Sequence, residues 1–257
     1  MEPLYLSKSR LNTYCQCPEK YKLRYIDQIV PEKTAIPLVE GSALHHIVEN
    51  ALVYSKVPNM AAAASKEYWD KIDPVSVAYE SEQDFKTAQE NVLTEAQGFL
   101  SMIGSLNCLD MESYFEHPLT NPTTGEVDES IVIRGYADLL DNPEDNVVRI
   151  IDIKTSAKAP SSEQANRCLE LGVYAYLMAV TFGFHCEIPV SLLYLVRTKT
   201  PKVVWLHSLR KGDDFLKVYD TIVSISTAIR HGLFWKNQGM ACSWCEYSDM
   251  CFTSMAA

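Results

Sequence analysis

The sequence contains no long hydrophobic run. No stretch approaches the ~18 consecutive apolar residues that a transmembrane helix needs, and the first residues lack the basic segment and apolar core of a secretory signal. We therefore expect no membrane association and a cytoplasmic location. In that reducing setting the eight cysteines are expected to bind metal or to pack as small core residues rather than to form disulfides.

Positive charge is also scarce. The net charge of −10 argues against a protein that coats nucleic acid through bulk charge. It leaves local recognition of nucleic acid possible, because a basic groove can coexist with an acidic remainder. We expect any contacts with DNA phosphates to come from the following basic residues: Arg10, Lys158, Arg197, Lys199 and Lys202.

Repeats, low-complexity tracts and obvious linkers are absent as well, and 257 residues suit one domain with a sizeable core. Helical patterns cover 7–25 (interrupted at Pro18), 41–55, 61–72, 78–104, 162–182 and 211–231. Strand patterns cover 110–117, 131–138, 147–154, 188–196 and 202–207. This order predicts an α/β fold with a mixed central sheet flanked by helices. We divide 1–257 into a mainly helical N-terminal region (1–109), a core (110–232) and a cysteine-rich tail (233–257).

Two aspartates lie at matching positions on two of these strands. If 131–138 and 147–154 form a hairpin around the turn at 142–146, the chain folds back near Asp145. Asp138 and Asp152 are then seven residues either side of that point, so they lie opposite or nearly opposite each other, with Cβ atoms about 4.5–5.5 Å apart. Strand alternation places Lys154 on the same face as Asp152.

Two carboxylates this close repel each other unless a cation neutralises them. A hard divalent ion such as Mg²⁺ or Mn²⁺ suits oxygen ligands, and Lys154 could orient an attacking water or stabilise charge on a phosphate. The pattern therefore indicates metal-assisted phosphodiester hydrolysis. The alternative is a pair of solvent-exposed aspartates at strand ends, with the lysine as their counter-ion.

The tail carries three cysteines in the spacing C-x₂-C-x₅-C. Cys242, Cys245 and Cys251 lie within ten residues, and in a reducing compartment such thiols point to a soft metal. A tetrahedral zinc site or an iron–sulfur cluster needs four ligands, so the fourth must come from elsewhere in the chain. One centre would then join the tail to a distant segment.

Five separated motifs resemble those of the PD-(D/E)xK nuclease superfamily. They are similar to its RecB-like and AddB-like exonuclease branch, which includes the iron–sulfur nucleases of CRISPR adaptation. The motifs are the opening Ser7–Tyr21 (S-x-S-x-L-x-x-Y-x-x-C-P-x-x-Y), Gly41–His45 (G-x-x-x-H), Gly135–Asp138 (G-x-x-D), Asp152–Lys154 (D-x-K) and Glu170–Tyr174 at the family's Q-x-x-x-Y. The resemblance implies a restriction-endonuclease-like core and a nuclease that uses Mg²⁺ or Mn²⁺.

The resemblance also implies roles for individual residues. His45 would be a third metal ligand beside Asp138 and Asp152, and the main-chain carbonyl of Ile153 a fourth, although His46 is an adjacent rival. Gly41 would let the helix of His45 approach the sheet closely. Glu170 and Tyr174 would belong to the catalytic machinery. Glu170 departs from the family's glutamine, so either it binds metal or Gln164 holds the functional role.

For the cysteine site the resemblance implies Cys17 as the fourth ligand, with Cys15 as the local alternative. It favours a structural 4Fe–4S cluster over zinc.

The expected function is a DNA exonuclease acting on single strands or ends in repair or recombination. A helicase or a recombination or CRISPR-adaptation protein is the expected partner. The competing hypotheses are a non-catalytic nucleic-acid-binding or assembly module and an iron–sulfur redox protein. The redox protein leaves the carboxylate pair unexplained.

Overall fold

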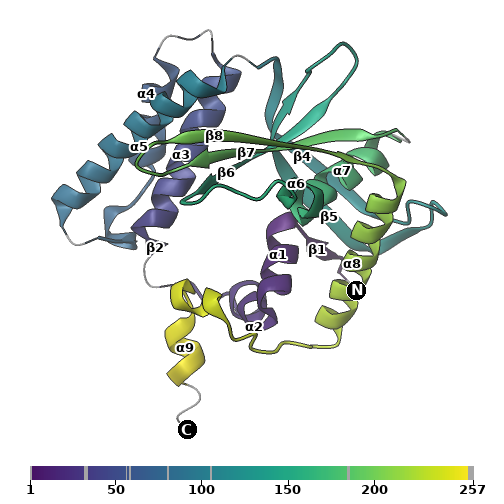
Figure 1. The fold of residues 1–257 in the computed structure, drawn as a ribbon. Coiled ribbons are helices and arrows are strands. Elements are labelled where there is room, and N and C mark those ends of the chain that lie inside the picture. Colours follow the sequence, from purple (N-terminus) through teal and green to yellow (C-terminus); the bar gives the residue numbers. More distant parts are fainter. Residues whose placement is uncertain are drawn as a thin grey trace.

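The computed structural model describes residues 2–31, 34–55, 57, 59–79, 81–104, 106–183 and 186–253. Its centre is a mixed sheet (Figure 1). The strands are β1 (Leu4–Leu6), β4 (Cys108–Thr120), β5 (Val127–Asp141), β6 (Arg149–Ser156), β7 (Ile188–Val196) and β8 (Lys202–Arg210). The order is β1-β5-β6-β7-β8. Strands β1 and β6 pair with different parts of one edge of β5, and β4 pairs along the opposite edge. A separate parallel pair joins β2 (Thr34–Ala35) to β3 (Val77–Ala78).

Helices cover both faces of the sheet. The N-terminal half contributes α1 (Lys8–Gln16), α2 (Pro18–Tyr21), a π-helical turn η1 (Lys22–Ile26), α3 (Ile36–Val53), α4 (Met60–Asp70), a 3₁₀ turn η2 (Pro74–Ser76) and α5 (Glu82–Ile103). The C-terminal half contributes α6 (Gln164–Arg167), α7 (Leu169–Phe182), α8 (Gly212–Arg230), a 3₁₀ turn η3 (Met240–Trp244) and α9 (Ser248–Thr253). The mixed α/β architecture agrees with the fold class expected from the sequence.

The two faces of the sheet bury separate apolar clusters. One cluster joins α1, α2, α7 and α8 to the sheet, and the other joins α3, α4 and α5 to it. Residues Leu171–Ala179 of α7 are buried all round, as expected of a helix enclosed by other elements. Strand β7 is buried on nearly every residue, which suits a central strand covered on both faces.

Three features differ from the sequence-based expectation. The three-residue β1 was not predicted, and it pairs in parallel with Ile131–Ile133 of β5. Such a short apolar segment carries no readable period, so its pairing is decided by tertiary contacts. The helix expected over 162–182 is interrupted at Cys168, whose extended backbone separates α6 from α7. Strands β4 and β5 are also longer than predicted.

Among the described helices, none combines the length and the apolar character needed to cross a membrane.

Candidate active site

The predicted hairpin forms, and it places the two aspartates opposite each other. Leu139 pairs with Ile151, and two further pairs run toward the turn. The next pair in this register is Asp138 and Asp152. Within the described residues the β5–β6 ladder ends one step short of them, and β1 takes over the same edge of β5 at Ile131–Ile133. The two carboxylates therefore lie in a fork where β6 leaves β5. The register predicted for this hairpin is confirmed.

Asp138 is held from several sides. The backbone N–H of Ile153 donates to its Oδ2 at 2.8 Å, and Nε2 of His45 lies 3.0 Å from the same oxygen. Its other oxygen, Oδ1, lies 3.3 Å from Nζ of Lys8. Burial alone would raise the pKa of Asp138, but the hydrogen bond with His45 and the charge of Lys8 hold that pKa well below its usual range.

Asp152 is fully buried and lies between two lysines. Its Oδ1 is 2.9 Å from Nζ of Lys8, and its Oδ2 is 2.9 Å from Nζ of Lys154. Burial and the neighbouring Asp138 raise the pKa of Asp152. Lys154 shares a face with Asp152, as strand alternation predicted.

Lys8 was not predicted as a site residue. Its ammonium group bridges one oxygen of each aspartate and lies 4.8 Å from the centre of the Tyr174 ring. A positive charge thus stands between the two carboxylates in this structure. The paired carboxylates concentrate negative charge that a cation must neutralise, as Lys8 does here, so their chemistry fits a metal site.

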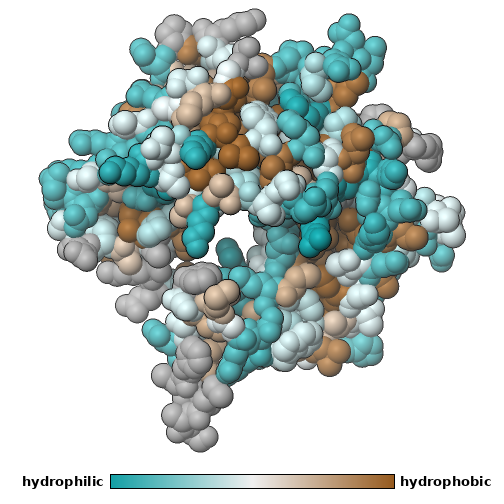
Figure 2. Space-filling view, viewed as in Figure 1, coloured by the Kyte–Doolittle hydropathy of each residue, from teal (hydrophilic) through white to brown (hydrophobic). Residues whose placement is uncertain are grey.

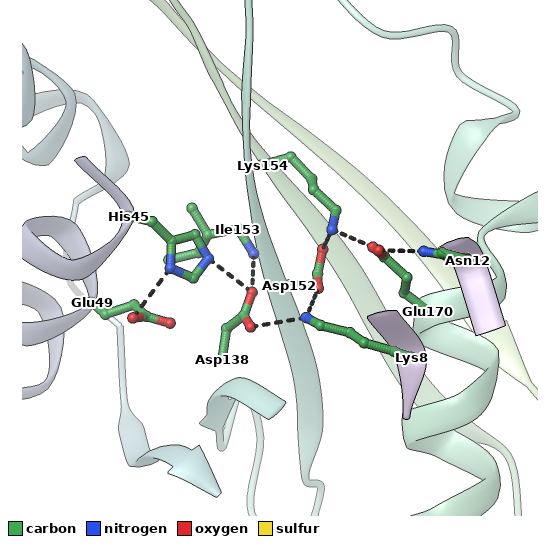
Figure 3. A network of polar contacts seen from close by, with 9 residues as sticks. All are labelled: Lys8, Asn12, His45, Glu49, Asp138, Asp152, Ile153, Lys154 and Glu170. Atoms are coloured by element: carbon green, nitrogen blue, oxygen red, sulfur yellow. Dashed lines mark hydrogen bonds and ion pairs between the residues drawn. The ribbon is translucent and has the colours of Figure 1, made fainter. Parts of the chain in front are cut away.

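Glu170 lies beside Lys154 rather than among the aspartates. The two side chains form an ion pair, and Nδ2 of Asn12 donates to Oε1 of Glu170 at 2.5 Å. Glu170 therefore bonds the ammonium group of Lys154 (Figure 3). Asn12 was also missed, although it lies four residues after Lys8 on α1, on the same side of the helix.

His45 points at Asp138, and its neighbour His46 does not. Nδ1 of His45 lies 3.2 Å from Oε2 of Glu49, one helical turn later on α3. The ring of His46 instead packs against the ring of Tyr68, with the two ring centres 5.6 Å apart. Ligand atoms of His45, Glu49 and Asp138 lie within 4.8 Å of one another. Glu49 was missed, although its spacing from His45 was a readable signal.

The electrostatics of this trio suit a cation. Burial would lower the pKa of His45, but hydrogen bonds with Asp138 and Glu49 raise it to about 10. Burial raises the pKa of Glu49 to about 7, against the pull of His45. Glu49 is 3% exposed, and its Oε1 is buried without a hydrogen-bond partner. An orphaned carboxylate oxygen next to an imidazole is a second observation that fits a metal site.

Two glycines allow the helices to approach this site. A Cβ on Gly41 of α3 would lie 3.2 Å from Oγ1 of Thr155 on β6, so the close approach expected from the sequence is present. A Cβ on Gly135 would lie 3.2 Å from the Tyr174 ring, which places Tyr174 of α7 against β5. Figure 2 shows an opening near α1, α3 and the sheet that is bordered by both hydrophilic and apolar residues.

The structure also locates Gln164 and Arg197. Gln164 lines the same hollow as Lys154 and Glu170. Arg197 forms ion pairs with Glu95 at 2.8 Å and Glu40 at 3.1 Å. The metal-binding role of the Ile153 carbonyl stays a prediction.

The four expected cysteine ligands line one cavity. Cys17, at the junction of α1 and α2, lines this cavity together with the tail residues Cys242, Cys245 and Cys251. Several polar contacts join the tail to the N-terminal helices. Tyr14 donates to the Leu233 carbonyl at 2.6 Å, Asn237 donates to the Gln16 carbonyl at 2.8 Å, and Lys20 pairs with Glu246 at 2.8 Å.

A mixed sheet with flanking helices that presents two opposed aspartates, a lysine two residues later and a nearby histidine defines a class of nucleases. The chain belongs to the PD-(D/E)XK nuclease superfamily, whose family model matches residues 5–252.

Two individual proteins are also similar to this chain. The Gene 69 protein of Mycobacterium phage D29 is 26% identical over 235 residues, with 80% of each chain covered. The crystal structure of a candidate exonuclease from Eubacterium rectale superposes with a TM-score of 0.55 at 13% identity, covering 96% of this chain and 87% of that one. At this identity the second likeness supports the fold alone.

Proposed function

We propose that the chain is a Mg²⁺- or Mn²⁺-dependent deoxyribonuclease that works as an exonuclease. The observation that carries this proposal is the fork between β5 and β6. Asp138 and Asp152 converge there on one positive charge, and Lys154 and His45 bond them from opposite sides (Figure 3). A binding-only protein has no need for this combination.

The residues that would hold the ion are His45, Asp138 and Asp152, with the carbonyl of Ile153 as a further ligand. Bound there, a divalent cation would activate a water molecule and neutralise charge on the scissile phosphate. Glu49 would act as a positioning residue, because its carboxylate accepts from Nδ1 of His45 and leaves Nε2 facing Asp138.

Lys154 would act on the phosphate side. Its ammonium group is bonded by Asp152 and Glu170, so it is both charged and fixed in direction. A fixed cation can orient the attacking water or stabilise charge that develops on a phosphoryl oxygen. Glu170 takes a positioning role here, and Tyr174 borders the fork next to Lys8.

The substrate we propose is single-stranded DNA or a DNA end. Hollows lined by site residues lie on both sides of the fork. One contains Asn12, Lys154 and Glu170, and another contains Lys8, Asp138 and Tyr174. A strand could therefore run through the site. The exonuclease mode, the RecB/AddB-like branch and a role in repair or recombination rest on the resemblance of the five motifs, as does a helicase, recombination or CRISPR-adaptation partner.

We also propose a structural 4Fe–4S cluster bound by Cys17, Cys242, Cys245 and Cys251. The support is that all four line one cavity, whereas Cys15 does not line it. Such a cluster would join the two ends of the described chain across the nuclease core. Zinc is the alternative occupant. Iron and sulfide analysis of anaerobically purified protein decides between them, and colourless protein that contains zinc without iron would overturn the cluster.

The nuclease proposal is tested with end-labelled single- and double-stranded DNA, incubated with Mn²⁺, Mg²⁺ or a chelator. We expect metal-dependent release of nucleotides from the ends by the wild-type protein and none by Asp152→Ala. Cleavage by neither protein would support the non-catalytic binding module instead. Equal cleavage by both would identify a contaminating nuclease and overturn the assignment of the site.

A further inference from the structure

The sheet surface beside Asp138 exposes aromatic side chains. On β5, Arg134 and Tyr136 are exposed, whereas Ile133 and Ala137, which flank this stretch, are buried. On β4, Tyr114 pairs directly with Tyr136 and is also exposed. The exposed fractions are 49% for Tyr114 and 52% for Tyr136. Two large rings side by side in solvent form a candidate contact surface.

These rings are held in place by their neighbours. The centres of the Tyr114 and Tyr136 rings lie 4.9 Å apart at 44°, and the Tyr114 hydroxyl donates to Glu116. The guanidinium group of Arg134 lies 4.6 Å from the centre of the Tyr5 ring, so β1 extends the same surface. We call Tyr5, Tyr114, Arg134 and Tyr136 the tyrosine platform.

The tyrosine platform continues into the fork. Tyr114, Arg134 and Tyr136 line a hollow of about 550 Å³ together with Lys8, Asp138 and Tyr174. Tyr136 is two residues from Asp138 on the same strand, which is a separation of about 7 Å. A nucleotide next to one whose phosphate lies at Asp138 is therefore within reach of the rings.

The charges in the hollow favour bases over phosphates next to the rings. Glu112 lines the same hollow, and a carboxylate repels a phosphate but tolerates a neutral base. Arg134 can meet a phosphate at the outer end of the platform. Within the described chain it forms no ion pair. Rings that carry one flanking cation are the pattern of a stacking site for unpaired bases.

We propose that the tyrosine platform stacks the unpaired bases that adjoin the scissile phosphate. The proposal deepens the nuclease function and rests on it for the position of that phosphate. Bases stacked within a duplex cannot lie on these rings, so the platform selects a strand that is already single or frayed at its end.

The test is fluorescence anisotropy in chelator, where no cleavage occurs, with two labelled oligonucleotides of equal length. One is a thymidine oligomer, and the other carries abasic residues at every internal position. The variant is the double substitution Tyr114→Ala and Tyr136→Ala. The matched controls are the double substitution to Phe, which keeps both rings, and Tyr54→Ala, which removes a tyrosine that is 46% exposed and lines none of these hollows.

We expect the wild-type protein to bind the thymidine oligomer at least about 10-fold more tightly than the abasic one. Each ring lost should weaken binding of the thymidine oligomer by roughly 5-fold, and both together by about 25-fold. The double alanine variant should then bind the two oligonucleotides equally, and both controls should behave like the wild-type protein. Because the rings are half exposed, the thermal midpoint of the variant should stay near that of the wild type.

The stacking role of the tyrosine platform is contradicted if the double alanine variant still prefers the thymidine oligomer as strongly as the wild-type protein does. Cleavage of the same thymidine oligomer in Mn²⁺ separates this result from failure of the nuclease proposal. Wild-type cleavage with an unchanged binding preference in the variant would overturn the platform alone. A lost preference without wild-type cleavage would overturn the nuclease alone.

Discussion

The fork between β5 and β6 and the cysteine-lined cavity hold their candidate ligands by different means. In the fork, Asp138 and Asp152 are buried and already paired with Lys8, Lys154 and His45. Their positions follow from strand register. Around the cavity, the four cysteines come from segments more than 200 residues apart in sequence and are each partly exposed.

This difference separates two roles for metal in one chain. An ion in the fork would enter a site that the sheet has already formed, so it would contribute mainly to chemistry. A cluster in the cavity would restrict the loop between the two ends of the described chain, so it would contribute mainly to stability.

Among substitutions that leave the proposed metal ligands in place, the largest effect is expected from Lys154→Met. It removes a charge bonded by Asp152 and Glu170, so the cleavage rate should fall by at least about 100-fold. Mn²⁺ affinity and iron content should be nearly unchanged. Single-turnover cleavage with calorimetric Mn²⁺ titration checks this, with Lys66→Met, at an exposed position of α4, as control. A parallel loss of Mn²⁺ affinity would make Lys154 a structural part of the metal site.

Next in size is Glu49→Gln. The amide keeps the shape of the side chain but loses the charge that orients His45, so Mn²⁺ affinity should weaken by roughly 10-fold or more. Cleavage at saturating Mn²⁺ should largely recover, and Glu67→Gln on the surface of α4 should leave both values unchanged. A cleavage defect that saturating Mn²⁺ fails to restore would assign Glu49 to something other than positioning.

The cavity is tested by Cys251→Ser. Bound iron should be lost and the thermal midpoint should fall by roughly 5–10 °C, as expected for a loss of a few kcal/mol in a domain of this size. Mn²⁺ affinity of the fork should persist in the folded fraction. Cys186→Ser, at an exposed cysteine outside the cavity, is the control. An unchanged midpoint and unchanged iron content would remove Cys251 from the site.

The smallest effect concerns pH. In metal-free protein the pKa of His45 is raised from 6.5 to about 10. A group whose pKa is raised by folding stabilises the folded state below its unfolded pKa and loses that contribution as pH rises through its folded pKa. The thermal midpoint should therefore fall between pH 7 and pH 10 by a few degrees more in the wild type than in His45→Gln. Equal falls in both proteins would contradict the charged state of His45.

The sequence alone predicted most residues of the fork, but it did not predict that Lys8 lies between the two aspartates. Two strands of readable pattern and one turn were enough to oppose Asp138 to Asp152, because register depends only on where the chain folds back. Lys8 lay inside the opening motif, yet its role depends on how α1 packs beside α7. Glu49 could have been found from its spacing of four residues after His45 on a helix.

Other features depend on contacts that no local pattern encodes. The pairing of β1 with β5 joins segments that are far apart in sequence, and the bond from Glu170 to Lys154 depends on how α7 packs against β6. The tyrosine platform arises because register places Tyr114 opposite Tyr136, and alternation alone did not distinguish these rings from an ordinary solvent-facing strand.

The central claim is that the opposed aspartates bind the ion that drives DNA cleavage. Its most direct test is the initial rate of cleavage of an end-labelled single strand as a function of Mn²⁺ concentration, for the wild-type protein and for Asp152→Asn. We predict a saturable rise for the wild type and no metal-dependent rate for the variant at any concentration, with both proteins equally folded. The same saturation curve for both proteins would contradict the account.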